Sequence, residues 1–297
     1  MSAAPAGPTV IEAAVNGMTT KEQNPHVPRT VDEIVEDSLR CLDAGASIVH
    51  HHNDEPNFGG PARHCAGPYI EVWTRLRATW PGLLLHPTTH GATADSTIEE
   101  RYAHVAELYE AGLAPVGTCD AGMLALAAPA PAGVVSLPET FGNPAADVDW
   151  ILRWHRERDL PVHISIFEPG FLRLILAHQK AGTLPREVKI QLYLGGDRLL
   201  FGLPATSTGL GAYLAMLEGT GLPWMAAVFG GDVVASGIAA LAIEKGGHVR
   251  VGLEDHHAPP RLARNVELVT EIAALCRSAG RPPATVEDAP KLLWGGC

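Results

Sequence analysis

The sequence predicts a single (β/α)₈ barrel over residues 1–297, and three observations lead to that prediction. Short runs of apolar and β-branched residues alternate along the chain with amphipathic helical stretches. Eight such strand–helix units fit into 297 residues, a length typical of this barrel. An open doubly wound sheet is the alternative, but no Gly-x-Gly-x-x-Gly follows the first predicted strand.

The predicted strands are short apolar runs bounded by turn residues. In chain order they cover 9–15, 47–52, 83–88, 113–118, 161–167, 190–194, 224–229 and 248–253. The predicted helices lie between and after them and cover 30–44, 68–79, 96–111, 145–158, 170–181, 207–218, 232–245 and 261–279. The Pro/Gly/Ala-rich stretch from Ala128 to Gly133 is predicted to be a loop.

Several helix boundaries carry local signals. Thr30 and Ser96 are predicted N-caps, because each hydroxyl precedes acidic residues in the first helical turn. Gly45, Gly112 and Gly246 each follow a predicted helix, where a left-handed cap is expected. These signals support the alternation of strands and helices on which the barrel prediction rests.

Composition and charge exclude several classes of function. Hydrophobic residues make up 46% of the chain and charged residues 19%, which is a globular composition, and no apolar run is long enough to span a membrane. The formal net charge of −11 argues against nucleic acid and anionic membranes as partners, though an acidic small molecule needs only a local cationic site. The five scattered cysteines and the lack of a secretory signal predict a reduced, cytoplasmic protein.

Three consecutive histidines end the second predicted strand. Successive side chains of a strand point to opposite faces, so His50 and His52 share one face, with Cβ atoms about 7 Å apart, and His51 takes the other. A His-x-His pair at the carboxyl end of a barrel strand, where active sites lie, can hold a divalent metal. Such a pair is also found in ordinary packing, so both interpretations stay open on this pattern alone.

The end of the eighth predicted strand offers a third ligand and a base. Glu254 shares strand parity with Arg250 and can reach the barrel mouth, where two histidines and one carboxylate leave room for water or substrate. Asp255 can accept a hydrogen bond from Arg250, which would hold it ionised as a base, although Arg250 could equally form a structural salt bridge. Spacing alone does not choose the third ligand, because further candidates are His86, His90, His248, His256 and His257.

Four segments, spread over nearly the whole chain, resemble the β-keto acid cleavage enzymes, whose founding activity is 3-keto-5-aminohexanoate cleavage. The most specific is the block Gly246-Gly247-His248-Val249-Arg250-Val251-Gly252-Leu253-Glu254-Asp255. The others are the second-strand block 45–52, the first loop with Asn16-Gly17 and residues 20–25, and the tail with residues 265–269 and 280–288.

The resemblance implies a zinc-dependent barrel enzyme that condenses a β-keto acid with acetyl-CoA. The products are acetoacetate and a new acyl-CoA, formed by retro-Claisen cleavage. By position, His50, His52 and Glu254 would bind one Zn²⁺ per subunit. Arg250 and Asp255 would form the dyad that removes a proton from the keto acid. The family's usual homotetramer is the expected assembly.

Four polar residues are predicted to bind substrate. Thr88 stands where the family has a hydroxyl after the third strand, and Thr118 stands near the corresponding position after the fourth. Asn16 and Thr19 lie in the first loop, beside the expected site. For the two strand-end threonines, a hydroxyl that caps the following loop is an equally good interpretation.

Three stretches depart from the family pattern. The aminohexanoate-specific enzyme carries a Glu just after its first strand to hold the substrate ammonium, whereas this chain has Gly17-Met18-Thr19 there. We therefore expect a substrate with an uncharged or differently polar side arm. His86 and His90, and Asn53-Asp54-Glu55-Pro56 in place of Val-Arg-Asp-Pro, bring extra imidazoles and acids near the expected metal.

Two other functions fit part of the pattern. Metal-dependent hydrolases of the amidohydrolase type also use His-x-His in a barrel, but on the first strand, with a further histidine pair and a late Asp. A zinc-binding barrel without catalytic activity is the other alternative, and it would not need both Arg250 and Asp255. Metal analysis combined with an acetyl-CoA-dependent assay separates all three.

Overall fold

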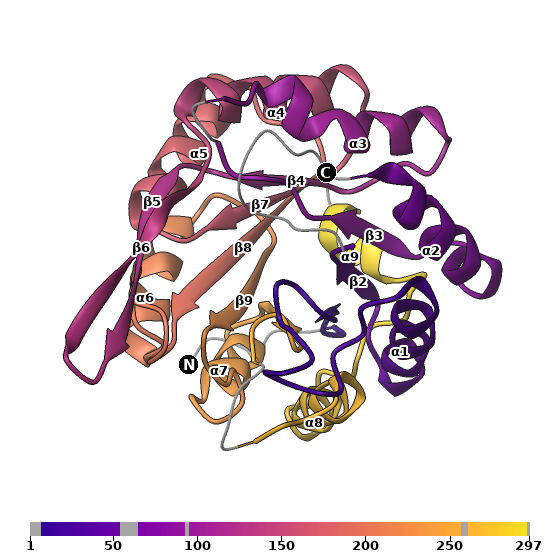
Figure 1. The fold of residues 1–297 in the computed structure, drawn as a ribbon, viewed down its shortest axis with the longest axis vertical. Coiled ribbons are helices and arrows are strands. Elements are labelled where there is room, and N and C mark those ends of the chain that lie inside the picture. The colour runs from indigo at the N-terminus through magenta and orange to yellow at the C-terminus, as the bar shows by residue number, and fades with distance from the viewer. Residues whose placement is uncertain (1–6, 54–64, 93–94, 257–260, 296–297) are drawn as a thin grey trace.

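Eight parallel strands form a nearly closed barrel in the computed structural model, which describes residues 7–53, 65–92, 95–256 and 261–295 (Figure 1). The strand order around the sheet is β3-β2-β1-β10-β9-β8-β7-β4. The two end strands approach each other, since the Val116 N–H donates to the Leu85 carbonyl at 3.0 Å. The predicted barrel is confirmed. Its strands are β1 (Ile11–Ala14), β2 (Ile48–His51), β3 (Leu84–Pro87), β4 (Gly117–Asp120), β7 (Val162–Ile166), β8 (Val188–Gly195), β9 (Trp224–Phe229) and β10 (His248–Val251).

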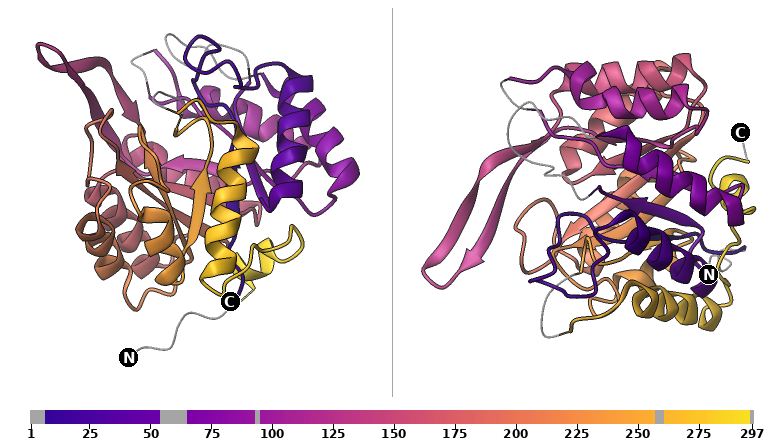
Figure 2. Two further views of the ribbon diagram at one scale, coloured as in Figure 1. Left: turned by 90° about the horizontal axis from the view of Figure 1, so that it is seen from below. Right: turned by 45° about the vertical axis from the view of Figure 1, so that its right-hand side comes forward.

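Helices surround the barrel and alternate with its strands, as Figures 1 and 2 show. They are α1 (Val31–Ala44), α2 (Ala66–Thr79), α3 (Ile98–Glu110), α4 (Ala145–Glu157), α5 (Pro169–Ala181), α6 (Ser207–Leu217), α7 (Ile238–Glu244), α8 (Asn265–Ser278) and α9 (Ala289–Trp294). The last of these, α9, has no counterpart among the predicted helices. It packs against the end of the barrel where the strands begin.

The helix caps agree with the sequence at most positions. Thr30 caps α1 in a capping box, and Gly45 ends that helix in the left-handed conformation. The two other predicted cap glycines, Gly112 and Gly246, also have positive φ angles. Ser96 is not a cap: Thr97 caps α3, because its hydroxyl is the one placed three residues before Glu100, which closes the capping box.

Two other sequence predictions were wrong. The stretch from Ala128 to Gly133 is not a free loop but the tip of an antiparallel hairpin of β5 (Met123–Ala130) and β6 (Gly133–Gly142). This hairpin projects from the barrel (Figure 2). The fourth barrel strand begins at Gly117 rather than at residue 113, since Ala114 has a φ of 39° and cannot continue an extended strand.

Two layers of side chains fill the barrel interior below its mouth. The lower layer is apolar and packs against Trp294 of α9, whose indole N–H donates to the Val188 carbonyl at 3.2 Å. Its members are Val10, Ile48, Val116 and Met225. The layer above is polar and fully buried, and it contains Glu12, His86, His163, Lys189 and Arg250. The polar layer therefore lies between an apolar floor and the carboxyl ends of the strands.

Among the described residues, no helix is both long enough and apolar enough to cross a membrane. The core lies mainly between the outer face of the barrel and the helices. Alternate residues of the first strand, Ile11 and Ala13, belong to that outer core, whereas Glu12 between them faces the interior. This alternation determines which side chains reach the mouth.

Candidate metal and acid–base site

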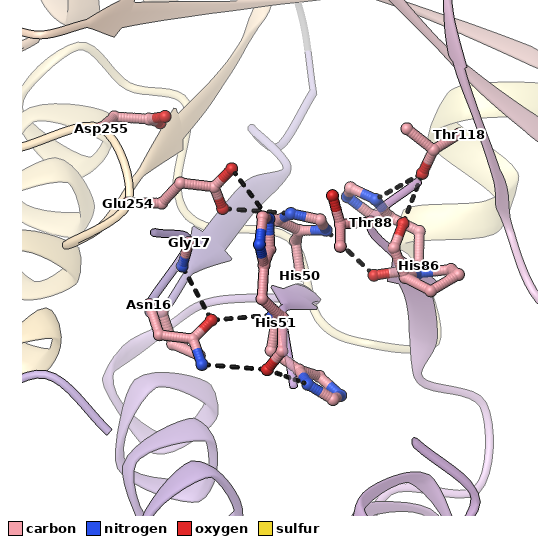
Figure 3. Close-up of polar contacts among 12 residues, drawn as sticks. Asn16, Gly17, His50, His51, His86, Thr88, Thr118, Glu254 and Asp255 are labelled. Atoms are coloured by element: carbon pink, nitrogen blue, oxygen red, sulfur yellow. Dashed lines mark hydrogen bonds and ion pairs between the residues drawn. The ribbon is translucent and has the colours of Figure 1, made fainter. Parts of the chain in front are cut away.

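Two imidazoles and one carboxylate converge at the mouth of the barrel (Figure 3). His50 lies on β2, His52 follows that strand, and Glu254 follows β10. β1 lies between these strands, and the Glu254 N–H donates to its last residue, Ala14, at 3.2 Å. His50 Nε2 lies 3.0 Å from Glu254 Oε2, and His52 Nε2 lies 3.4 Å from Glu254 Oε1. One atom of each residue lies within 4.8 Å of the others.

These separations fit a zinc site. Two ligand atoms that are each about 2.0–2.1 Å from zinc, at a tetrahedral angle, lie about 3.3 Å apart. The two measured contacts, 3.0 and 3.4 Å, bracket that value. In addition, His50 Nδ1 donates to the carbonyl of His86 at 3.0 Å, so its Nε2 lone pair faces the other two ligands. The donor set of two imidazoles and one carboxylate is one that zinc prefers.

The middle histidine of the triplet points away from this cluster, as strand parity predicts (Figure 3). Trp73 Nε1 donates to His51 Nε2 at 3.0 Å, and His51 Nδ1 donates to the His52 carbonyl at 3.2 Å. Burial lowers the pKa of His51 to about 3, so the ring is neutral. His51 therefore serves to pack α2 against the barrel.

The first loop supports the cluster through the side chain of Asn16, whose amide bonds only to main-chain groups. Asn16 donates from Nδ2 to the carbonyls of Pro28 and His52, and its Oδ1 accepts from the N–H groups of Gly17 and His52. All four hydrogen-bonding positions of this amide are thus occupied by the main chain. Asn16, a predicted substrate-binding residue, fixes the backbone of His52 in this way.

Glycine is required next to Asn16 for a steric reason. Gly17 has a φ of +52°, and a Cβ built on it would lie 2.2 Å from Cγ of Glu254. The loop therefore packs directly on the carboxylate-bearing side chain and limits its position. Arg29 holds the same loop, since its Nη1 donates to the Gly17 carbonyl at 2.9 Å.

An arginine–aspartate pair lies beside the cluster. Arg250 donates from Nε to Asp255 Oδ2 at 3.0 Å and from Nη2 to Asp255 Oδ1 at 3.2 Å. The same Nη2 lies 3.0 Å from Glu254 Oε1, so one guanidinium connects the two carboxylates. This bidentate arrangement fixes both the distance and the plane of the Asp255 carboxyl group.

Burial dominates the acidity of Asp255. It raises the pKa of this carboxyl to about 6, although the Arg250 charge acts in the opposite direction. The sequence suggested that a hydrogen bond from Arg250 would hold the carboxylate ionised. The structure instead gives a carboxyl group whose pKa lies closer to neutrality, which suits a general base better than an ordinary aspartate does.

The three predicted threonines differ in their surroundings. Thr118 lies inside β4 rather than after it, and its hydroxyl donates to the Pro87 carbonyl at 2.5 Å. The hydroxyl of Thr19 donates to the Leu253 carbonyl at 2.7 Å. Thr88 follows β3 and is only partly buried. Of the three, Thr88 is the best placed to meet a ligand.

The other candidate histidines are distributed around the barrel. His86 Nε2 lies 3.0 Å from Glu12 in the interior, and His248 Nδ1 accepts from the Val10 N–H at 3.0 Å at the opposite end from the mouth. His256 Nε2 lies 3.9 Å from Asp232. His90 is buried near His52, and burial lowers its pKa. His257 and residues 54–56, which belong to a segment that differs from the family pattern, lie outside the described part of the chain.

Sequence reasoning missed two buried acids of the site. Asp120 ends β4, and burial raises its pKa to about 6, while His50 and Arg250 are close enough to lower it. Glu12 lies beneath the cluster on β1. Two features of the sequence could have identified these acids. Glu12 is an isolated acid within an apolar strand, and Asp120 has the same strand parity as Thr118.

Comparison with protein families gives one match over almost the whole chain. The model of the β-keto acid cleavage enzymes matches residues 8–294. A 3-oxoadipate:acetyl-CoA acetyltransferase of Cupriavidus necator is 29% identical over 96% of this chain and 94% of its own length. A 3-keto-5-aminohexanoate cleavage enzyme of Fusobacterium nucleatum is also 29% identical, over 96% of this chain and 97% of its own length. A 3-dehydrocarnitine:acetyl-CoA trimethylamine transferase of Rhizobium meliloti is 28% identical over 91% of both chains.

Solved structures agree in fold. The apo structure of ObcA superposes with a TM-score of 0.67 at 16% identity, covering 91% of this chain and 66% of that chain. A truncated 3-deoxy-D-arabino-heptulosonate 7-phosphate synthase of Thermotoga maritima gives a TM-score of 0.54 at 14% identity, covering 93% and 89%. At these identities the likeness shows the fold alone.

Proposed function

The chain belongs to the β-keto acid cleavage enzyme family, and we propose that it condenses a β-keto acid with acetyl-CoA to give acetoacetate and a new acyl-CoA. In this reaction the carbanion formed from the keto acid adds to the acetyl thioester, and CoA migrates within the adduct to the former keto carbon. A retro-Claisen step then releases the new acyl-CoA and the carbanion of acetoacetate, which takes back the proton from the base. The observation that carries the proposal is the placement of the Arg250–Asp255 pair directly beside the His50–His52–Glu254 cluster.

His50, His52 and Glu254 are the residues that would hold zinc in this proposal. When bound, zinc supplies a Lewis acid that polarises the β-keto oxygen and stabilises developing enolate charge. The protein contributes the orientation of the ligands: the His86 carbonyl fixes the His50 ring, and Asn16 fixes the backbone of His52.

Asp255 is the proposed general base. Its carboxylate would take the proton from the carbon between the carboxylate and keto groups of the substrate, and the C–H electron pair stays on that carbon. A base is most effective when its pKa lies near the operating pH, and burial has moved the pKa of Asp255 to about 6. Arg250 holds this carboxyl group through two hydrogen bonds and keeps it next to Glu254.

The side arm of the substrate is proposed to be uncharged or differently polar rather than an ammonium. The loop that carries an acid in the aminohexanoate-specific enzyme here presents Met18, which is 44% exposed, while the Thr19 hydroxyl is engaged with Leu253. A panel of β-keto acids with neutral, anionic and ammonium side arms tests this point. A strong preference for the ammonium substrate would refute it.

Two measurements on the purified protein distinguish the proposed function from its rivals. Metal analysis reports bound zinc, and an enzyme-coupled assay reports acetoacetate formed from acetyl-CoA and each β-keto acid. We expect bound zinc and turnover that requires acetyl-CoA. Zinc with acetyl-CoA-independent hydrolysis would favour a metal-dependent hydrolase, and zinc without turnover on a broad panel would favour a non-catalytic barrel.

The homotetramer and the cytoplasmic location are proposals that rest on the resemblance and on the composition of the chain. Light scattering after size-exclusion chromatography measures the mass of the assembly. A mass of four times 31.4 kDa is the expected result. Fractionation of the source cells would show the location.

A further inference from the structure

Beneath the mouth of the barrel, Glu12 is surrounded by groups that donate to it or carry positive charge. Its side chain is fully buried. Glu12 Oε1 accepts from Arg250 Nη1 at 3.1 Å and lies 3.0 Å from His86 Nε2, while Glu12 Oε2 accepts from the Lys189 ammonium. Burial acts to raise the pKa of Glu12, but Lys189, His86 and His163 hold it well below its usual range, so the residue is a carboxylate.

Glu12 contacts Nη1, the one nitrogen of the Arg250 guanidinium that has no acceptor at the mouth of the barrel. Nε and Nη2 are engaged by Asp255 and Glu254, and Nη1 is engaged by Glu12. A guanidinium is planar, so acceptors on different edges fix the rotation of the whole group. The acceptors at the mouth hold only Nε and Nη2, and the group lies over the Tyr193 ring with Cζ 5.4 Å from its centroid, so Glu12 supplies the acceptor for the remaining nitrogen, Nη1.

Lys189 explains how such a buried carboxylate is tolerated. Arg250 is shared with Asp255 and Glu254, so without Lys189 the buried carboxylate of Glu12 would lack a counter-ion of its own, which is energetically unfavourable. The ammonium of Lys189, on β8, supplies a counter-ion that leaves the Oε1 contact with Arg250 intact. Ligand atoms of Glu12, His86 and His163 also lie within 4.8 Å of one another, but the lysine ammonium already pairs with this carboxylate.

We propose that Glu12 is a positioning residue, which fixes the plane of the Arg250 guanidinium and thereby the orientation of Asp255, with Lys189 as its counter-ion. This inference rests on the proposed function in one respect, namely that Asp255 acts as the base. Glu12 acts through Arg250, since it lies in the layer beneath the mouth and contacts the guanidinium from below. Glu12 and Lys189 thereby gain a role, although neither belongs to the His50–His52–Glu254 cluster or to the Arg250–Asp255 pair.

A matched pair of double variants separates positioning from charge balance. Both Glu12→Gln/Lys189→Met and Glu12→Leu/Lys189→Met remove the two opposite charges together, so neither leaves a buried ion unpaired. The glutamine retains an oxygen that can accept from Arg250 Nη1, whereas the leucine does not. Thermal unfolding and zinc content, measured on both, confirm that each variant is folded and can bind the metal.

The expected result is a selective loss of kcat. The glutamine variant should retain kcat within about fivefold of the wild type, and the leucine variant should lose about 100-fold, with KM for the keto acid changed by less than about threefold. Equal kcat values for the two folded variants would overturn the inference. If the leucine variant does not fold, Glu12→Asn/Lys189→Met replaces it, because the shorter amide withdraws the acceptor from Arg250 without leaving a buried charge, and full activity of that variant would overturn the inference as well.

A crystal structure of the leucine variant gives a readout independent of turnover. The inference predicts that Arg250 turns toward Glu254 and no longer makes both hydrogen bonds to Asp255, and retention of both bonds would overturn it. If the wild type, loaded with zinc, shows no acetyl-CoA-dependent cleavage, the proposed function fails. The orientation of Arg250 in the variant then decides the positioning role alone.

Discussion

The imidazole of His50 is the side chain on which the proposed metal site depends most directly. It is buried, and its Nε2 faces Glu254 because Nδ1 is engaged by the His86 carbonyl. His50→Ala should lower bound zinc from about one ion per chain to less than about 0.2, because one of three protein ligands is lost. Elemental analysis of the purified variant measures this change.

His51 provides the matched control. It is the next residue in the chain and equally buried, but its ring contacts Trp73 rather than the cluster. His51→Gln should therefore keep its zinc and lose roughly 1 kcal/mol of unfolding free energy through the weakened Trp73 contact. Normal zinc in His50→Ala, or zinc loss in both variants, would contradict the proposed ligand set.

Asp255 allows the base and the metal to be tested separately. Asp255→Asn has nearly the same shape and can still accept from Arg250, but it cannot take up a proton. Zinc content should remain at the wild-type level, and kcat should fall by roughly 10²- to 10⁴-fold. A variant that kept both its zinc and its full turnover would show that another group is the base.

Single residues were predictable where chemistry and strand parity coincide. Parity placed His50 and His52 on one face with His51 on the other, and it brought Arg250 next to Glu254. It did not single out Glu12, because one acid in an apolar strand looks the same whether it faces solvent or a buried lysine. Its partner Lys189 is far away in the sequence, and only the closed barrel brings the two together.

At the scale of elements, the loop after β1 carries a testable steric constraint. A Cβ on Gly17 would overlap Glu254, and its φ of +52° disfavours any other residue. Gly17→Ala should therefore displace the carboxylate, reduce zinc affinity by at least about tenfold and lower the unfolding free energy by more than the roughly 1–2 kcal/mol expected from backbone strain alone. Competition with a chelator and thermal unfolding measure the two effects.

Gly182 is the control for this substitution. It has a similar φ of +69°, at the end of α5, but nothing lies within 4 Å of a Cβ built there. Gly182→Ala should lower the unfolding free energy by the amount expected from backbone strain alone and leave zinc affinity unchanged. Equal zinc affinity in the two alanine variants would mean that the contact between Gly17 and Glu254 does not hold the carboxylate in place.

Elements were predictable where their signals are local. The capping box of Thr30 and the left-handed Gly45 could be identified from a few adjacent residues. The β5–β6 hairpin could not, because its Ala-, Pro- and Gly-rich sequence has weak strand propensity, and its strands are held by pairing with each other. The short helix α9 depends on contacts with the apolar floor of the barrel, which no local pattern reveals.

At the scale of the whole molecule, buried neutral histidines make stability depend on pH. Burial, followed by the charges of Arg281 and Lys189, lowers the pKa of His248 to about 3, and its Nδ1 accepts from the Val10 N–H. An unfolded histidine titrates near 6.5, so between these values the unfolded chain binds the extra proton. The contribution of His248 to stability is therefore present above about pH 6.5 and is lost progressively as the pH falls.

His248→Asn removes this titration and retains an acceptor for Val10. Between pH 7 and pH 5 the wild type should lose about 2 kcal/mol more unfolding free energy than the variant does. Urea unfolding of both proteins at the two pH values gives the difference, in which contributions from all other groups cancel. Equal losses would show that His248 titrates normally in the folded barrel.

The fold as a whole was predictable because eight strand–helix units recur over the entire chain, and a barrel places the ends of all its strands at one mouth. The arrangement of side chains inside the barrel could not be predicted from the sequence. The polar layer beneath that mouth is formed by residues from strands that are distant in the sequence, as Glu12 with Lys189 and Arg250 illustrates. Its one carboxylate, Glu12, pairs with two cations that lie on other strands, Lys189 and Arg250.

Isotope labelling tests the central claim most directly. The zinc-loaded wild type is incubated with acetyl-CoA carrying ¹³C in both acetyl carbons and with an unlabelled β-keto acid, and the products are identified by mass spectrometry and NMR. The proposed reaction predicts acetoacetate labelled only in its acetyl carbons, together with an unlabelled new acyl-CoA. Labelled acetate without acetoacetate, or keto acid cleavage that leaves acetyl-CoA unconsumed, would contradict it.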